Sequence, residues 1–292
     1  MLQMSLVLGQ TVIVMHHFAE EVYLQSIQEY KVHFLFLLPP VLIMLTNSPS
    51  VENYDLSSVE GAMSSGAPAS IHICRKALKR LPNTKRIDQG YGMTETSGAC
   101  TLPIMGNSTV ATTHSGVILP NYEMKLVDSD GREVPLGEGG ELQLRAPAMM
   151  LGYIGRPEAT ADAFSNGWYK TGDIARIDEN GLVYIVGRSK DVIKSQGAQA
   201  SPTELEDVLL SHPDILDAGV IPVPLEDGDE GFFAFIVRKN DLSKEDIHKF
   251  VNYQVAEFKR LRAGINLVDT IPKSDTGKIL RNVLKDMYKS RI

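Results

Sequence analysis

Short apolar runs alternate with helical patterns over the first 114 residues of the chain. Thr11–Met15 is a β-branched apolar run and predicts a strand, whereas Glu20–Tyr30 spaces its apolar residues like one face of a helix. Further elements are predicted at Val32–Leu38 (strand), Val41–Leu45 (helix, opened by Pro39-Pro40), Ser58–Met63 (strand), Ile71–Arg80 (helix) and Lys85–Gln89 (strand). Strands that alternate with helices at this spacing indicate a parallel sheet of the α/β class.

The pattern changes after residue 114, where short strands are separated by turn residues. Asp128–Gly131 is such a turn, and Asp178–Gly181 separates two more apolar runs with an Asn-Gly pair, a strong hairpin signal. Strands are predicted at Gly116–Leu119, Tyr122–Val127 and Gly140–Arg145. We expect a small antiparallel sheet or β-barrel over residues 115–187.

Residues 188–292 mix helices and strands and predict a compact α+β module. Ser201 can cap a helix, Pro202 suits its first turn, and Glu204 takes the capping-box position. Strands are predicted at Ala218–Pro222 and Phe232–Val237, and a helix at Lys244–Glu257. Charge supports a division near residue 187, because the part before it carries 13 basic and 19 acidic residues and the part after it carries 16 and 17.

Composition is that of a globular protein with about two domains. The chain has 292 residues, is 43% hydrophobic and 22% charged, and has a formal net charge of −7, which does not favour binding to nucleic acid. Its two cysteines cannot make a disulfide framework, so a reducing compartment is expected. We expect no membrane span, and the apolar opening Met1–Met15 lacks the basic region and cleavage site of a signal peptide.

The last three residues, Ser290-Arg291-Ile292, are similar in kind to the Ser-Lys-Leu peroxisomal address. We predict import into peroxisomes through the receptor that reads such addresses. The alternatives are an arbitrary tail and a cytoplasmic protein.

Two segments of the first 187 residues carry candidate chemistry. Gln89–Glu95 follows a predicted strand, and its glycines allow close backbone approach while Thr94 and Glu95 offer a hydroxyl and a carboxylate to a phosphate and its metal. In Gly167–Asp173, Asp173 is placed where a strand begins and could accept both hydroxyls of a ribose. The alternatives are an ordinary strand-to-helix connection and a turn-capping Asp.

Two more segments lie in the last third. Val186–Gly197 gathers Arg188, Lys190 and Lys194 at the inferred boundary, where a hinge could swing a small domain. Pro272–Arg281 contains an Asp-Thr-Gly loop that can project Lys278 toward a phosphate or carboxylate. The alternatives are a polar linker and a surface lysine beside a turn.

In this order and at this separation, the four segments resemble the adenylate-forming superfamily of acyl-CoA synthetases, luciferases and peptide-synthetase adenylation domains. Within it, the chain is most similar in kind to the 4-coumarate–CoA ligase and medium-chain acyl-CoA ligase branch, and the resemblance runs along essentially the whole chain. It is strengthened by Leu38–Leu42, Tyr54–Ser58, Ser65–Pro68 and the spaced Gly152-Tyr153, Glu158–Thr160, Phe164 and Gly167-Trp168.

The resemblance implies a domain order and a role for each matching residue. Residues 1–114 would be part of the α/β subdomain that binds AMP, 115–187 a β-barrel subdomain, and 188–292 a mobile C-terminal lid. Ser65, Gly66, Ala67, Gly90 and Tyr91 would line the adenine and acyl pocket, and Gln89, Gly92 and Gln199 are further cofactor-binding positions. Thr94 would contact the α-phosphate, Glu95 would hold Mg²⁺, and Asp173 and Arg188 would bind the ribose. Lys190 would be the hinge, Lys278 would bridge carboxylate and α-phosphate, and Lys194, Gln196 and Gly197 would face the nucleotide or thiol.

The resemblance also implies the reaction and its cofactors. Such enzymes join a carboxylic acid to ATP, giving acyl-AMP, and then transfer the acyl group to coenzyme A; many of this branch serve secondary metabolism. A non-catalytic AMP-binding remnant or interaction module, and an adenylation partner of a carrier protein, are the alternatives.

The sequence departs from the family in two places. Gln196 stands where the branch often has Lys, and the phosphate-gripping loop that ends Pro-Lys-Gly is missing together with roughly 250 upstream residues. We therefore expect reduced or absent activity, since one lost charge-stabilising donor commonly costs about 10²–10³ in rate. We also expect the parallel sheet to expose an apolar surface that is prone to aggregation.

Overall fold

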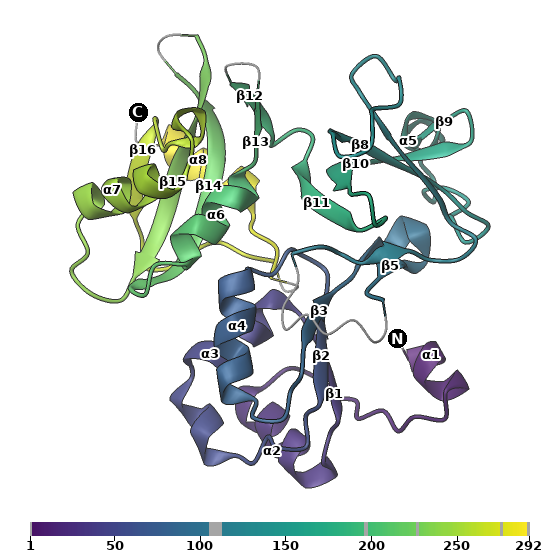
Figure 1. Cartoon of the computed structure of the whole chain (residues 1–292), viewed down its shortest axis with the longest axis vertical. Helices are drawn as coiled ribbons and strands as arrows, with labels where there is room; N and C mark the ends of the chain where they lie inside the picture. The colour runs from purple at the N-terminus through teal and green to yellow at the C-terminus, as the bar shows by residue number, and fades with distance from the viewer. Residues whose placement is uncertain (1, 105–112, 196–197, 226–227, 275–276, 291–292) are drawn as a thin grey trace.

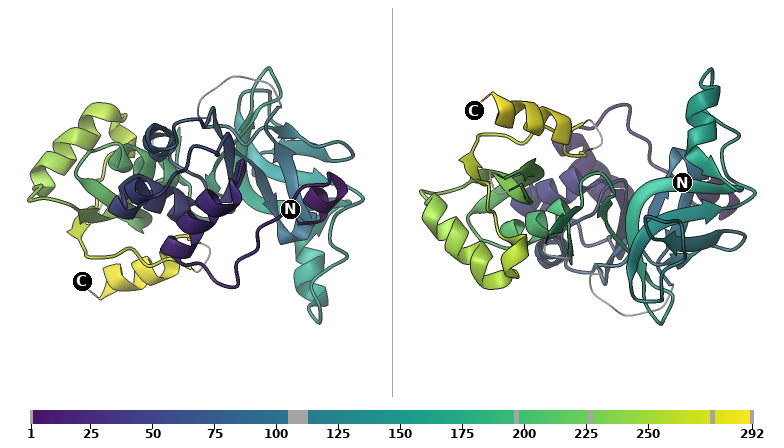
Figure 2. Two further views of the ribbon diagram at one scale, coloured as in Figure 1. Left: turned by 90° about the horizontal axis from the view of Figure 1, so that it is seen from below. Right: turned by 90° about the horizontal axis from the view of Figure 1, so that it is seen from above.

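The chain forms three units that meet near the middle of the molecule (Figure 1). The coordinates are a computed structural model and describe residues 2–104, 113–195, 198–225, 228–274 and 277–290. An α/β unit comes first, an antiparallel unit follows, and an α+β unit ends the chain. Both views of Figure 2 place the antiparallel and C-terminal units at opposite ends of the molecule. No helix among the described residues is both long enough and apolar enough to cross a bilayer.

The first unit is a three-stranded parallel sheet covered by helices on one face. The sheet order is β1-β2-β3. Leu35 and Leu37 point from β1 into the core, where buried side chains from all three helices pack against them. The elements are α2 (Glu20–Tyr30), β1 (Phe34–Leu37), α3 (Pro39–Asn47), β2 (Gly61–Ser64), α4 (Ile71–Arg80) and β3 (Ile87–Gln89). The predicted parallel α/β arrangement is confirmed.

The opposite face of this sheet is exposed only at β1, because every residue of β2 and β3 is buried. Phe34 and Phe36 alternate with the core leucines and are 41% and 44% exposed. Parallel sheets are normally covered on both faces. The predicted exposure of apolar surface is therefore confirmed.

The strand predicted at Thr11–Met15 is wrong. The chain runs here without secondary structure after a short helix α1 (Leu2–Val7), and Val14 is 76% exposed. A β-branched run becomes a strand only where a neighbour completes its hydrogen-bond ladder, and no described strand lies beside it.

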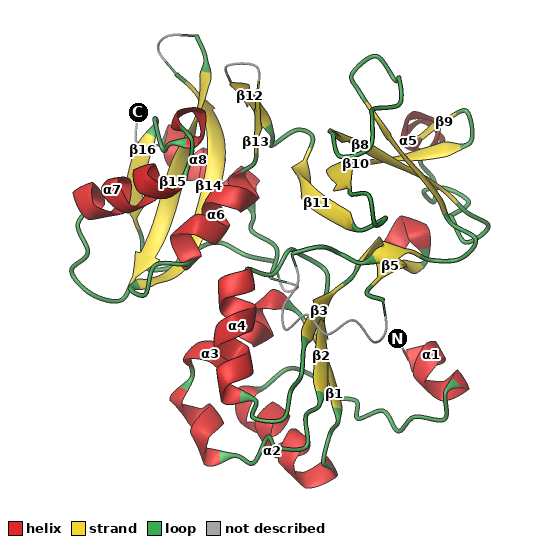
Figure 3. Ribbon diagram, viewed as in Figure 1, coloured by secondary structure: helices red, strands yellow, loops and turns green. Residues whose placement is uncertain are grey.

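The second unit contains two antiparallel sheets, coloured yellow in Figure 3, and no closed barrel among the described residues. The larger sheet has the order β11-β10-β8-β7, with β9 paired to β10; the smaller has the order β4-β5-β6. The predicted antiparallel pairing is confirmed, and the predicted barrel is wrong. The turn signals specify neighbouring hairpins, but closure requires the first and last strands to pair. The elements are β4 (Tyr91–Met93), the 3-10 helix η2 (Thr94–Thr96), β5 (Gly98–Leu102), β6 (Val117–Ile118), β7 (Glu123–Val127), β8 (Gly139–Arg145), α5 (Pro157–Ala163), β9 (Phe164–Ser165), β10 (Trp168–Ile177) and β11 (Val183–Arg188).

The C-terminal unit is a sheet with helices on both faces. Alternate residues of β15 point to the two sides, so that Phe232 packs with α6 and α7 whereas Phe235 packs with α8. The elements are β12 (Ile193–Ser195), β13 (Ala198–Ala200), α6 (Pro202–Leu210), β14 (Ile215–Pro224), β15 (Glu230–Arg238), α7 (Lys244–Gln254), β16 (Gly264–Leu267) and α8 (Arg281–Lys289).

The start of α6 matches the sequence prediction in part. The Ser201 hydroxyl accepts a hydrogen bond from the Thr203 amide, as a capping residue does. Glu204 instead pairs with Lys259 at 2.6 Å, because a charged partner is within its reach. The reciprocal half of the predicted capping box is therefore absent.

Candidate functional site

A cavity of about 780 Å³ lies where the three units meet and is lined by residues of all of them. Small-molecule sites in proteins commonly have volumes of roughly 300–1,000 Å³. The sequence-predicted residues that line it are Gly66, Ala67, Gln89, Gly90, Tyr91, Gly92, Asp173, Arg188, Lys190 and Lys278. Segments that are far apart in the chain thus share one cavity.

Asp173 is a buried carboxylate held by two donors. Its side chain accepts a hydrogen bond from the Tyr91 hydroxyl at 2.6 Å and pairs with Arg188 Nε at 3.0 Å. Burial raises the pKa of Asp173, while the Tyr91 hydrogen bond and the charges of Arg188 and Lys278 act in the opposite direction. An ionised carboxylate has about four acceptor positions, so Asp173 retains capacity for the hydroxyls of a ligand.

The backbone of β10 explains where Asp173 points. The sequence places it at the start of a strand, but it lies inside the ten-residue strand β10, directly opposite Arg188 of β11. The pairing of β10 with β8 is irregular between Lys170 and Ile174, and Gly172 has a φ of +68°. A bulge of this kind re-aims side chains and is common beside active sites.

Two loops at the carboxyl edge of the parallel sheet form the next part of the cavity wall. The buried Gln89 amide bonds the backbone of Ala69 twice, accepting from its N–H and donating to its carbonyl, each at 3.0 Å. These bonds tie the loop of Gly66 and Ala67 to the end of β3. Ligands of α/β sheets bind at this edge.

Gly92 allows the close packing that follows. A Cβ there would lie 2.1 Å from the Gly98 carbonyl oxygen and 2.6 Å from Ala99 Cα. β4 and β5 therefore approach each other as closely as they do only because position 92 has no side chain.

Glu95 and Thr94 do not line the cavity. Thr94 is exposed, and Glu95 accepts a hydrogen bond at 2.9 Å from the hydroxyl of Tyr153, which lies 3.4 Å from that of Tyr169. Tyr153 has no role predicted from the sequence, although the Gly152-Tyr153 pair contributes to the family resemblance.

Glu95 offers one carboxylate ligand to the expected Mg²⁺. No group of three or more His, Cys, Asp or Glu within the described ranges could hold a metal ion by itself. Magnesium at phosphate sites commonly takes one or two carboxylates, with phosphate oxygens and waters completing the shell. A single accessible carboxylate such as Glu95 suits that arrangement.

Lys278 reaches the cavity from the C-terminal unit. It is an exposed residue in a hairpin-like loop in which Lys273 and Ile279 form an antiparallel bridge. At neighbouring Gly277 a Cβ would lie 2.1 Å from Pro40 Cγ, so this loop packs directly on the first turn of α3. The contact brings Lys278 to the α/β unit.

The remaining predicted residues are placed elsewhere or not described. Ser65 precedes the loop of Gly66 but does not line the cavity. Lys194 and Gln199 belong to β12 and β13, and their side chains are not described. Gln196 and Gly197 lie outside the described residues, as do Arg291 and Ile292 of the predicted peroxisomal address.

Sequence reasoning assigned no role to several charged residues of the cavity. Glu206, Asp217, Lys273 and Arg281 line it and pair with one another across the C-terminal unit. The only sequence signal is that basic residues gather near the end of the chain, and this does not identify their acidic partners. These basic residues are Lys273, Lys278, Arg281, Lys285, Lys289 and Arg291.

Several curated proteins are similar to this chain in sequence. The chain is 38% identical over 291 residues to 4-coumarate–CoA ligase-like 2 of Arabidopsis thaliana, covering 98% of this chain and 51% of that protein. It is 36% identical to luciferin 4-monooxygenase of Luciola mingrelica, covering 96% and 52%. The chain thus spans about half the length of the curated relatives it matches.

Solved structures agree on the fold. The anthranilate CoA ligase AuaEII in complex with anthranoyl-AMP superposes with a TM-score of 0.87 at 27% identity, covering 97% of this chain and 56% of that one. The amide bond synthetase McbA from Marinactinospora thermotolerans superposes with a TM-score of 0.86 at 28% identity, covering 98% and 58%.

Two family profiles match the chain itself. The one described as the AMP-binding enzyme C-terminal domain matches residues 204–278, which end at Lys278. The one described as AMP-binding enzyme matches residues 1–154, more than half of the chain. The chain belongs to the AMP-binding family of adenylate-forming enzymes.

Proposed function

We propose that this chain carries the nucleotide-holding part and the lid of an acid–CoA ligase, which activates a carboxylic acid with ATP and passes the acyl group to coenzyme A. The observation that supports it most is the buried Asp173 with its Tyr91 and Arg188 donors in one cavity with Lys278. A ribose-binding carboxylate and a cation for the reacting phosphate are the two groups that such a reaction needs on opposite parts of the nucleotide.

The proposed chemistry has two steps. A carboxylate oxygen of the acid attacks the α-phosphorus of ATP, the bond from that phosphorus to the bridging oxygen breaks, and pyrophosphate leaves. The thiol sulfur of coenzyme A then attacks the acyl carbonyl carbon, the bond to the phosphate oxygen breaks, AMP leaves, and the thiol proton passes to solvent.

Residues of this chain have distinct tasks in the first step. Asp173 accepts the ribose hydroxyls and fixes the nucleotide, while Arg188 keeps that carboxylate ionised and oriented. Lys278 places an ammonium beside the reacting carboxylate and phosphate and neutralises their negative charge. Magnesium, held by Glu95, would supply charge neutralisation at the phosphates of ATP.

A second reading is an AMP-binding module without turnover. The feature that favours it is that Thr94 and Glu95, the expected phosphate and metal contacts, do not line the cavity. An adenylation partner of a carrier protein is a third reading, with acyl transfer to a tethered thiol in place of coenzyme A.

The readings are separated by two measurements on the 292-residue chain. Incubation with ATP, Mg²⁺, coenzyme A and a panel of carboxylic acids is expected to release pyrophosphate in step with acyl-CoA. AMP binding by calorimetry without any pyrophosphate release would support the non-catalytic reading. Acyl-AMP formation without transfer to coenzyme A would favour the carrier-protein reading, and absence of both binding and release would contradict the proposal.

We also propose peroxisomal localisation, which rests on Ser290-Arg291-Ile292 alone. A fluorescent protein fused to the amino end, leaving these residues free, is expected to enter peroxisomes. A matched fusion with Arg291→Ala is expected to remain in the cytosol, and a diffuse signal from the unmodified fusion would refute the proposal.

A further inference from the structure

The described residues of the Lys278 loop, 272–274 and 277–281, are held by two ion pairs, one on each side. Inside it, the Leu280 amide donates to the Pro272 carbonyl at 2.9 Å, and the Ser274 amide donates to the Lys278 carbonyl at 2.9 Å. On its amino side, Lys273 pairs with Asp217 of β14 at 2.6 Å. These bonds set the shape of the loop, but they do not attach its carboxyl side to the helices of the C-terminal unit.

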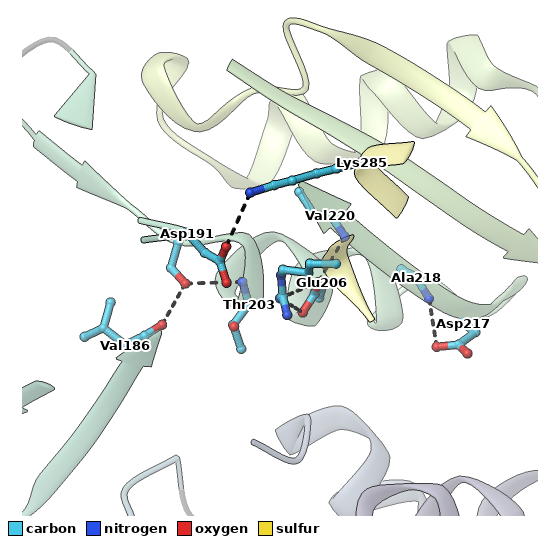
Figure 4. Close-up of polar contacts among 10 residues, drawn as sticks. Val186, Asp191, Thr203, Glu206, Asp217, Ala218, Val220 and Lys285 are labelled. Atoms are coloured by element: carbon cyan, nitrogen blue, oxygen red, sulfur yellow. Dashed lines mark hydrogen bonds and ion pairs between the residues drawn. The ribbon is translucent and has the colours of Figure 1, made fainter. Parts of the chain in front are cut away.

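Arg281 fixes that side through Glu206. One terminal nitrogen of Arg281, Nη2, donates to both carboxylate oxygens of Glu206, at 2.7 and 2.9 Å. Glu206 lies on α6 and is only 7% exposed, and its Oε1 also accepts the Val220 amide of β14 at 2.9 Å. Figure 4 shows Glu206 beside Val220, with Lys285 of α8 reaching toward Asp191 nearby. Glu206 thus joins α6, β14 and the first residue of α8.

The ion pair of Glu206 with Arg281 also affects the position of the Lys278 loop. Arg281 is the third residue after Lys278, so the orientation of Arg281 sets where the loop leaves the C-terminal unit. The other described ion pair of α8 joins Lys285 to Asp191. It is longer, at 3.7 Å, and lies one helical turn further from the loop. The contact of Glu206 with Arg281 is therefore the ion pair nearest to Lys278 on this side, where Ile279 also packs against the core cluster of Leu284.

We propose that Glu206 is a positioning residue for Lys278 and acts through Arg281. The proposal rests on the proposed function in that Lys278 is taken to act on the reacting phosphate. Glu206 itself touches no reacting atom; it determines whether Lys278 is presented to the cavity or swings free with the loop.

The test compares three variants of the full chain with a matched control. Glu206→Gln keeps the shape and removes the charge, Arg281→Met removes the donor, and Arg281→Lys retains a cation that can donate to both oxygens. Glu204→Gln is the control, because Glu204 is on the same helix but is half-exposed and pairs with Lys259. Work at roughly pH 8.5 keeps Glu206 ionised, since burial raises its pKa to about 7.

The first measurement is amide hydrogen exchange of residues 277–284, which requires no activity. Glu206→Gln and Arg281→Met are expected to speed exchange there about tenfold or more, because removing one member of a buried ion pair leaves the other unpaired. Arg281→Lys and Glu204→Gln are expected to stay within about threefold of the unmodified chain. Should Glu206→Gln fail to fold, the amide exchange of residues 277–284 in Arg281→Met tests the role of the ion pair.

The second measurement separates positioning from general stability. In acyl-AMP formation, Glu206→Gln is expected to lower kcat about 10- to 100-fold while the KM for ATP changes less than about threefold, since small displacements of a catalytic group have effects of this size. Folded Glu206→Gln and Arg281→Met chains whose 277–284 exchange matches the control would overturn the proposal. An unmodified chain without turnover would count against the proposed function, and the exchange experiment would still decide the role of Glu206.

Discussion

At the scale of single residues, the proposed nucleotide binding depends most on the carboxylate of Asp173. Asp173→Asn keeps the shape but removes the charge that accepts ribose hydroxyls in the proposed function. We expect it to weaken AMP binding about 10- to 100-fold, because hydrogen bonds to a charged group contribute about 1.5–3 kcal/mol. Calorimetric titration with AMP measures the change.

The matched control for this substitution is Asp130→Asn, an exposed aspartate in a turn of the same unit that pairs with Arg132. Its AMP affinity is expected to equal that of the unmodified chain. Equal affinity in Asp173→Asn as well would mean that Asp173 does not contact the nucleotide.

The hydroxyl of Tyr91 gives the same site a predictable pH dependence. In the proposed function Asp173 accepts both hydroxyls of a ribose diol best when it is ionised. Burial raises the pKa of Asp173, and the Tyr91 hydrogen bond lowers it. Tyr91→Phe removes the lowering contribution, so the pKa moves up and protonation begins at a higher pH. As pH is lowered, AMP affinity of Tyr91→Phe is therefore expected to decline earlier than that of the unmodified chain.

Dissociation constants for AMP between about pH 4 and pH 8 would show this shift. Tyr122→Phe is the control, because the Tyr122 hydroxyl donates to the Thr96 carbonyl and not to Asp173. Superimposable pH curves for Tyr91→Phe and the control would show that the Tyr91 hydrogen bond does not govern this carboxylate.

At the scale of elements, the close approach of β4 and β5 depends on one missing side chain. Gly92→Ala would place a Cβ against backbone atoms of Gly98 and Ala99, which cannot rotate away. We expect a loss of roughly 1–3 kcal/mol in the free energy of unfolding, as for other overpacked sites. Urea denaturation gives the value.

Gly61→Ala is the comparison, because the nearest atoms to a Cβ there belong to the half-exposed ring of Phe34, which can move aside. We expect its cost to stay below about 1 kcal/mol. Equal costs for the two substitutions would contradict the close-packing argument.

At the scale of the whole molecule, the exposed side of β1 in the parallel sheet is the main liability. Phe34 and Phe36 lie on it with ring centres 5.1 Å apart, on an edge strand whose outer side has no described neighbour. Exposed apolar edge strands template association. The double substitution Phe34→Thr with Phe36→Thr keeps strand propensity and is expected to reduce self-association.

Sedimentation velocity at several protein concentrations would quantify the monomer fraction of this double variant. Tyr253→Thr serves as the control, since Tyr253 on α7 is 92% exposed but lies far along the chain from this sheet. An unchanged monomer fraction in the double variant would place the association surface elsewhere.

The sequence by itself determined the elements that local physics decides. Glu20–Tyr30 and Ile71–Arg80 are helices over the predicted residues, because apolar residues at helical spacing and the flanking turns act within one segment. The motifs around Tyr91, Asp173 and Lys278 also predicted the family, which is confirmed, since residue type and short-range order are properties of the chain alone.

Only the tertiary structure decided which residues meet. Thr11–Met15 lacks a partner and forms no strand, and the sheets of the second unit stay open, because pairing depends on distant segments. Tyr91 and Asp173 are 82 residues apart, and Glu206 and Arg281 are 75 apart. No periodicity spans such separations; the contacts arise because folding carries α6, α8, β4 and β10 to one cavity, where burial makes each charge dependent on its partner.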